Sequence, residues 1–84
     1  MEKMVYTPEY GILLRMLRRL RQERGLTQVQ LAERLSENQS FVSKCERGEH
    51  RLDVLELRIF CNGLGITLVE FITELEGELE KLEK

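Results

Sequence analysis

The stretch GLTQVQLAERLSENQSFVSKCERGEHRLDV, residues 25–54, decides how this chain folds. Thr27 is followed three residues later by Gln30, a capping box in which two side chains satisfy free N–H groups at a helix start. A glycine, Gly25, precedes the box and ends whatever helix comes before it. The pattern predicts a short helix from about residue 28, which buries Leu31, Ala32 and Leu35.

A second short helix follows almost at once. Residues 36–38 form the turn, Asn38 is a suitable N-cap, and Gly48 stops the helix after about Arg47. Two short helices joined by about three residues are too close for an antiparallel hairpin and favour the steep crossing of a helix-turn-helix. The sequence therefore predicts a helix-turn-helix centred on residues 27–47.

The second of these helices has one apolar and one polar side. At about 100° per residue, Val42 and Cys45 point inward together. The opposite side carries hydroxyl, amide and cationic groups, which hydrogen-bond base edges and phosphates in DNA. A solvated surface without a ligand is the alternative. The outward residues are Gln39, which projects from the first turn, and Ser40, Ser43, Lys44 and Arg47.

Three more helices are predicted around this pair. Thr7 before Pro8 opens a helix that runs to about Arg24, because proline is well tolerated at the first helical position. Capping-box patterns open two later helices, one that finishes near Gly63 and one that runs to the C-terminus. Strand signals are nearly absent. We expect an all-α fold in a single domain, residues 1–84, with a core of residues 8–65 and a last helix over residues 67–84.

Composition narrows the class of protein. A chain of 84 residues that is 42% hydrophobic and 33% charged suits one globular domain. It has no apolar run of membrane-spanning length and no signal peptide, so we expect a cytoplasmic protein without a membrane partner. We expect Cys45 and Cys61 to be reduced core thiols, against a disulfide or a metal site.

The charge is unevenly distributed. The net charge is −2, but residues 1–51 carry 10 Lys and Arg against 7 Asp and Glu, whereas residues 52–84 carry 3 against 8. The two parts therefore have net charges of +3 and −5. A basic part beside an acidic part suits a protein that turns one face to phosphates and another to solvent or a partner.

At residues 25–54 the chain closely resembles the Cro/C1-type phage repressors, also called xenobiotic-response-element-like regulators. Thr-Gln, Leu-Ala, Gln-Ser, Val-Ser-Lys and Glu-Arg-Gly all occur in the register of that family. The resemblance extends from Arg15 to about Phe71. It implies a five-helix, lambda-repressor-like DNA-binding domain from a prokaryote or phage, whose second and third helices form the helix-turn-helix.

The resemblance also implies roles for single residues. Gln28 matches a glutamine that bonds a phosphate and braces the first residue of the recognition helix, here Gln39. Arg21 and Glu46 match a structural ion pair. Gln39 is the best candidate for a bidentate adenine contact, and Lys44 is able to reach guanine. The implied base-reading residues are Gln39, Ser40, Ser43 and Lys44, and the implied phosphate contacts are Gln28, Arg47 and Arg51.

Two positions need structural information. Where the family usually has glycine in the turn, this chain has Ser36, so a left-handed backbone there costs roughly 1 kcal/mol or the turn is built differently. Phe41 falls between the buried and exposed sides of its helix. We expect it to pack beside the preceding helix, in preference to contacting a thymine methyl group.

The family works as dimers on two-fold-related half-sites, and the last helix is our candidate interface. Isoleucine at heptad position a with leucine at d suits two strands, although nearby glutamates disfavour a long parallel coiled coil. The alternative is that Leu68, Phe71, Ile72 and Leu75 only close the core of the monomer. The interface residues that we expect are Leu68, Ile72, Leu75, Leu79 and Leu82.

These features predict a sequence-specific transcriptional regulator, a repressor, that binds a two-fold-symmetric operator in double-stranded DNA as a homodimer. The alternative is an antitoxin of a toxin–antitoxin pair, with a small toxin as partner, or a restriction-modification controller protein; either would regulate its own operon. We expect neither enzymatic activity nor a cofactor, because the single histidine, His50, has no catalytic arrangement of neighbours in the sequence.

Overall fold

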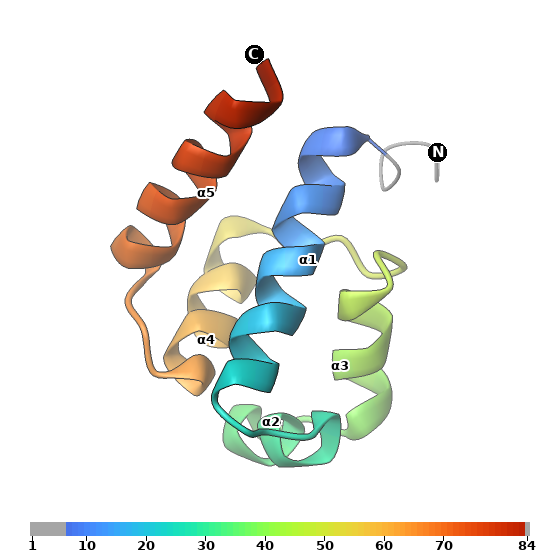
Figure 1. Ribbon diagram of the computed structural model, residues 1–84. Coiled ribbons are helices and arrows are strands. Elements are labelled where there is room, and N and C mark those ends of the chain that lie inside the picture. Colours follow the sequence, from blue (N-terminus) through green and yellow to red (C-terminus); the bar gives the residue numbers. More distant parts are fainter. Residues whose placement is uncertain (1–6, 84) are drawn as a thin grey trace.

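The computed structural model describes residues 7–83, and over this range the chain contains five helices and no strand. The helices pack into one bundle (Figure 1). This confirms the all-α prediction and its helix boundaries to within a residue or two. The elements are α1 (Pro8–Glu23), α2 (Gln28–Leu35), α3 (Gln39–Glu46), α4 (Val54–Leu64) and α5 (Leu68–Glu83).

The helices begin where the sequence places their caps. Thr7 Oγ1 accepts a hydrogen bond from Tyr10 N over 3.1 Å, and Asn38 Oδ1 accepts one from Phe41 N over 2.9 Å. The predicted capping boxes are complete at α2 and α4, and the same pair of bonds is present before α5. Because each cap satisfies N–H groups that a helix leaves free, these short elements start at defined residues.

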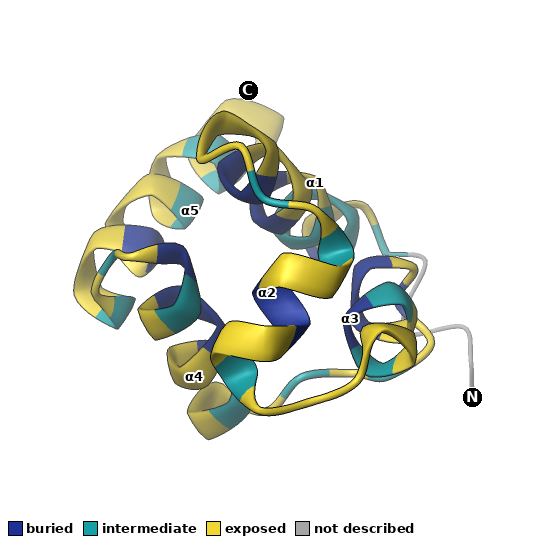
Figure 2. Cartoon of the chain, turned by 90° about the horizontal axis from the view of Figure 1, so that it is seen from below, coloured by how far each residue is buried: buried dark blue, intermediate teal, exposed yellow. Residues whose placement is uncertain are grey.

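α1 lies at the centre of the bundle, with α3 on one side, α5 on the other and α2 below (Figure 1). Viewed from below, the helices turn their buried residues toward one another (Figure 2). Burial there raises the pKa of the Cys45 thiol to about 12 and that of Cys61 to about 11, so both stay protonated at neutral pH. Both thiols are free. The core residues are Met16, Leu17, Leu20, Leu31, Ala32, Val42, Cys45, Leu57, Phe60, Cys61, Leu64 and Phe71.

The structure divides the apolar residues of α5 between the core and solvent. Phe71 is buried, and Leu68 and Leu75 pack against the core beside it. Ile72 and Leu82 are 42% and 46% exposed. The core-closing alternative is therefore correct for Phe71, Leu68 and Leu75 and wrong for Ile72. Leu35 of α2, predicted to be buried, is only partly so and packs at the edge of the core.

The turn between α2 and α3 is left-handed at Ser36, with φ 58° and ψ 40°. Glu37 N donates to Ala32 O over 2.9 Å and Ser36 N to Glu33 O over 3.2 Å, so the carbonyls at the end of α2 are satisfied. Serine thus occupies the backbone conformation that favours glycine, and the angle between the two helices is set without one. Among the described helices, none has the length and apolarity to cross a membrane.

Candidate nucleic-acid interface

α3 is held to the protein by one side and leaves the other open. Val42 and Cys45 are completely buried against the core. On the opposite side Gln39, Ser40 and Lys44 are exposed. Ser43 is half-buried, and Arg47 follows as the exposed C-cap of the helix. No other part of the described chain covers this polar side, so α3 is available as a recognition helix.

The first residue of α3 is tied to the first residue of α2. Gln39 Nε2 donates a hydrogen bond to Gln28 Oε1 over 2.7 Å, and Gln28 Nε2 donates in turn to Glu46 Oε1 over 3.0 Å. Gln28 thus links both ends of α3. The structure contains the brace that the sequence resemblance implies, and it fixes the direction in which the Gln39 amide points.

Glu46 is a buried carboxylate at the junction of α1, α2 and α3. Arg21 Nε donates to Glu46 Oε2 over 2.6 Å and Arg21 Nη2 to Glu46 Oε1 over 3.1 Å, which is a bidentate ion pair. A third bond joins Arg21 Nη1 to Leu26 O over 2.8 Å. The expected ion pair between Arg21 and Glu46 is therefore present, and it anchors the recognition helix to α1.

The protonation of Glu46 depends on these donors. Burial by itself raises the pKa of this carboxyl, but hydrogen bonds from Arg21 and Gln28 outweigh it, with help from the charges of Arg21 and Arg18. The pKa of Glu46 is therefore lower than its ordinary value of 4.5. At neutral pH the carboxylate is ionised and fully hydrogen-bonded, which is the state that the anchor of α3 requires.

Two of the candidate phosphate-binding arginines already have partners. Arg47 Nε and Nη2 donate to the two carboxylate oxygens of Glu49 over 2.9 and 3.1 Å, and Arg47 Nη1 also donates to Ser43 Oγ. This hydrogen bond from Arg47 lowers the pKa of Glu49. The guanidinium of Arg51 lies over the ring of Tyr10, 4.2 Å from its centroid. Both arginines are exposed, so these contacts do not remove them from the surface.

Phe41 packs inward. Its ring centroid lies 6.3 Å from that of Phe60 in α4 and 5.2 Å from that of His50. The prediction of a packing role is correct, but these aromatic partners belong to α4 and to the segment before it, not to α2. His50 Nε2 lies 3.0 Å from Glu56 Oε2, which joins the same segment to the start of α4.

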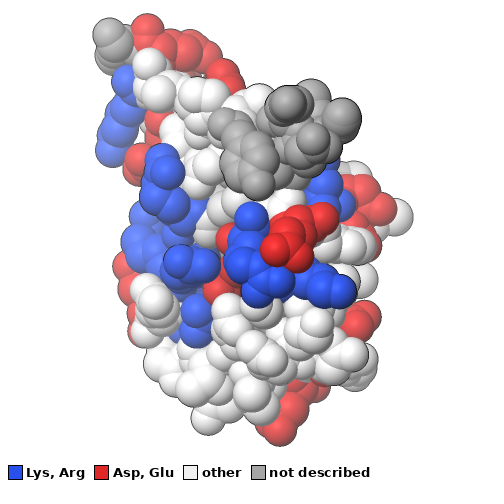
Figure 3. Space-filling view, turned by 90° about the vertical axis from the view of Figure 1, so that its right-hand side faces the viewer, with Lys and Arg blue, Asp and Glu red and all other residues white. Residues whose placement is uncertain are grey.

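Sequence analysis did not single out two arginines of α1 that lie beside α3. Arg15 and Arg18 are exposed, and Arg18 Nε lies 3.5 Å from Glu46 Oε1. On the face that carries α3, Lys and Arg side chains form a band across the middle with uncharged surface below it (Figure 3). Their spacing of three in the sequence places both on one side of α1, but only the packing of α1 against α3 brings that side next to the polar face.

Comparisons with known proteins agree with this geometry. Residues 12–71 match a family described as "Helix-turn-helix domain". An uncharacterised HTH-type transcriptional regulator of Sinorhizobium fredii is 38% identical over 55 residues, which cover 66% of this chain and 71% of the relative.

Solved structures show the same fold and the same family. An XRE-family like protein from Pseudomonas syringae pv. tomato has a TM-score of 0.82 at 42% identity, covering 90% of this chain and 93% of that chain. A variant of the restriction-modification controller protein C.Esp1396I has a TM-score of 0.79 at 27% identity, over 89% of this chain and 95% of that one. The clp gene regulator ClgR from C. glutamicum has a TM-score of 0.73 at 26% identity, over 86% and 94%. With its braced recognition helix and these relatives, the chain belongs to the Cro/C1-type, or XRE, family of helix-turn-helix DNA-binding transcriptional regulators.

Proposed function

We propose that this protein is a transcriptional repressor that binds a two-fold-symmetric operator as a homodimer. The observation that carries the proposal is the polar side of α3, which is uncovered while its first residue is held by Gln28 and its last by Arg21. A helix fixed at both ends can enter the major groove with little further loss of side-chain freedom. Occupying a promoter then excludes polymerase.

The brace supports a specific role for Gln39. One N–H of its amide is used by Gln28, which leaves the second N–H and the carbonyl oxygen for a base. A glutamine amide with one free donor and one free acceptor can pair with N7 and N6 of adenine. We propose Gln39, Ser40, Ser43 and Lys44 as the base-reading residues, with Lys44 directed at guanine.

Phosphate contacts fix the position of the helix. We propose that Gln28, Arg47 and Arg51 bind the DNA backbone. For Arg47 this requires exchange of Glu49 for a phosphate, and because the pair is exposed to solvent the exchange costs little. It also releases the Ser43 hydroxyl, which the same arginine holds in the free protein.

A dimer follows from the small number of base pairs that one helix can read. Two recognition helices about 34 Å apart contact successive major grooves on one side of the duplex. We propose the exposed apolar residues of α5 as the contact between subunits: Ile72 and Leu82 at its centre, Leu79 beside them, and Leu68 and Leu75 reaching only its edge because they pack on their own core.

The test is a gel-shift measurement on sequences first selected from a random DNA pool. The double substitution Gln39→Ala with Lys44→Ala should abolish discrimination between the selected and scrambled duplexes while weaker, salt-sensitive binding persists. Arg58→Ala, which removes one exposed charge on α4, is the matched control and should retain discrimination. Unchanged discrimination in the double variant would disprove this choice of base-reading residues.

One more specialised role has structural support. The controller protein C.Esp1396I matches nearly the whole length of this chain, which favours an autoregulatory controller as the second candidate. An antitoxin would differ in having a stoichiometric protein partner. A pull-down of the tagged protein from its native host separates the two, since a small partner at equal stoichiometry supports the antitoxin.

A further inference from the structure

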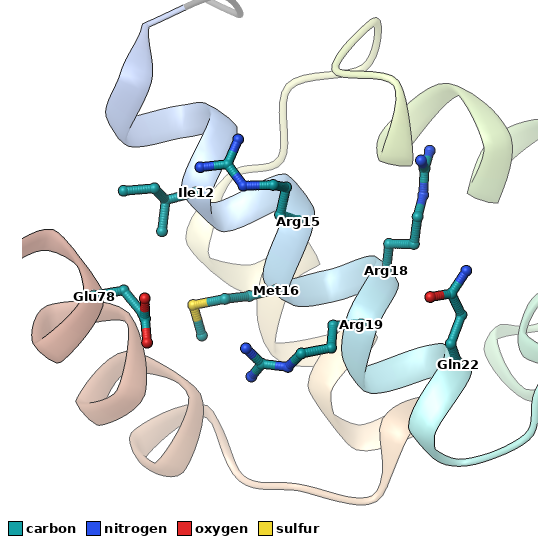
Figure 4. A pocket seen from close by; sticks show the side chains of 7 residues that line it. All are labelled: Ile12, Arg15, Met16, Arg18, Arg19, Gln22 and Glu78. Carbon is teal, nitrogen blue, oxygen red and sulfur yellow. The ribbon is translucent and has the colours of Figure 1, made fainter. Parts of the chain in front are cut away.

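A cavity of about 490 Å³ lies along α1 on the side that faces α5, and its residues come almost entirely from α1 (Figure 4). Its volume falls within the roughly 300–1,000 Å³ of small-molecule sites. Four side chains that donate hydrogen bonds line it: Arg15, Arg18, Arg19 and Gln22. This polar lining is separate from the outward side of α3.

The remaining lining is mostly apolar. Ile12 and Met16 contribute hydrocarbon and thioether surface, and Glu78 of α5 is the single carboxylate. Lys81 Nζ lies 3.3 Å from Glu78 Oε2, so a neighbouring cation offsets that negative charge. The cavity therefore combines a positive rim with an apolar wall.

Two of the three arginines are available to a ligand. Arg19 is paired with Glu74 and lies 3.4 Å from Glu23, so it ties α1 to α5 at this edge. Among residues 7–83, Arg15 has no ion-pair partner. Arg18 is half exposed and lies near Glu46 alone, an acid that is already bonded to Arg21 and Gln28.

The geometry points to a binding site for a small organic anion, with a phosphate or carboxylate head group on Arg15 and Arg18 and an apolar body against Ile12 and Met16. Guanidinium groups bind such head groups in a bidentate manner, and two of them one helical turn apart can share one anion. The site belongs to the protein alone, so the proposal does not depend on the function of α3.

The test is an NMR titration of the ¹⁵N-labelled protein with phenyl phosphate, at constant ionic strength. Saturable shifts confined to residues 12–22 and the neighbourhood of Glu78 are expected. Inorganic phosphate, which lacks the ring, and benzyl alcohol, which lacks the charge, should each bind more weakly. The double substitution Arg15→Ala with Arg18→Ala should weaken phenyl phosphate binding about ten-fold or more, because charge-assisted hydrogen bonds are lost.

Arg58→Ala is the matched control, since it removes an exposed arginine of α4 away from the cavity, and it should leave binding unchanged. Circular dichroism of each variant checks that the fold is retained. Shifts that do not saturate, or that spread over exposed cations of the whole surface, would overturn the proposal, as would binding that survives the loss of both Arg15 and Arg18.

Discussion

Glu46 shows how one side chain serves both stability and recognition. Its carboxylate is fully buried and accepts hydrogen bonds from Arg21 and Gln28, and Gln28 in turn positions Gln39. A buried charge is costly unless it is paired, and removal of one partner leaves the other uncompensated. The residue that anchors α3 is thus also the one whose loss the fold tolerates least.

Glu46→Ala should therefore lower the free energy of unfolding by about 3–5 kcal/mol, because Arg21 remains buried without its carboxylate. Urea denaturation followed by circular dichroism measures this change. Glu49→Ala removes a glutamate from an exposed pair with Arg47, and its midpoint should stay close to that of the native protein. Equal midpoints for the two variants would contradict the structural role of the buried pair.

Ser36 gives a prediction of opposite sign. Its left-handed backbone is strained for a residue with a Cβ, so Ser36→Gly should raise the free energy of unfolding by about 1 kcal/mol. Ser43→Gly, inside α3 with helical backbone, should lower it, because glycine is a poor helix former. Thermal denaturation of both variants measures the difference, and a destabilised Ser36→Gly protein would show that the serine side chain has a compensating role.

Local patterns predicted the caps well, and they predicted pairings across the fold only where the family resemblance supplied them. The contact of Arg18 with Glu46 joins two helices far apart in sequence, and that of Arg47 with Glu49 depends on the backbone after α3. Neither has a local signature. Thr27, Asn38 and Asp53, in contrast, bond atoms three residues away, so the sequence alone determines their partners.

At the scale of elements, α3 is coupled to α1 and α2 through an acid, and this makes its anchoring dependent on pH. The pKa of Glu46 is lowered on folding, so the stability that this group supplies is present above about pH 4.5 and is lost as the pH falls through the lower, folded-state value. Glu56, whose pKa is lowered by bonds from Asp53 and His50, adds to the same acid sensitivity.

Glu46→Gln separates the two contributions. The substitution keeps an acceptor for Arg21 and removes the titration, so the loss of stability between pH 6 and pH 3 should be smaller in the variant than in the native protein. Urea denaturation at a series of pH values gives both curves. If the curves are parallel, Glu46 does not carry the acid sensitivity.

The last helix marks a limit of sequence patterns. Apolar residues at spacings of three and four predict a helix with an apolar side, and α5 has one. The spacing does not distinguish the protein's own core from a partner subunit as the surface that covers this side. In the structure Leu68 and Leu75 face the core, and Ile72 on the same helix stays exposed. Only the packing of α4 against α5 decides between them.

At the scale of the whole molecule, α5 leaves apolar surface without a partner in the monomer. Ile72→Glu with Leu82→Glu should convert a dimer into a monomer, because charges would be buried at the contact, while circular dichroism stays unchanged. Analytical ultracentrifugation measures the change in mass. Leu55→Glu on α4 is the matched control at a site that is 68% exposed, and a monomer produced by this variant instead would move the interface to α4.

The bonds of Glu46 also limit how the recognition unit can be reused. Residues 27–47 look like a self-contained cassette that could be grafted into another scaffold to change its target. The donor that orients Glu46, however, comes from Arg21 on α1, outside the cassette. A transplant that omits this arginine would carry a buried acid without its cation, so engineering of specificity has to exchange surface residues of α3 within the intact host domain.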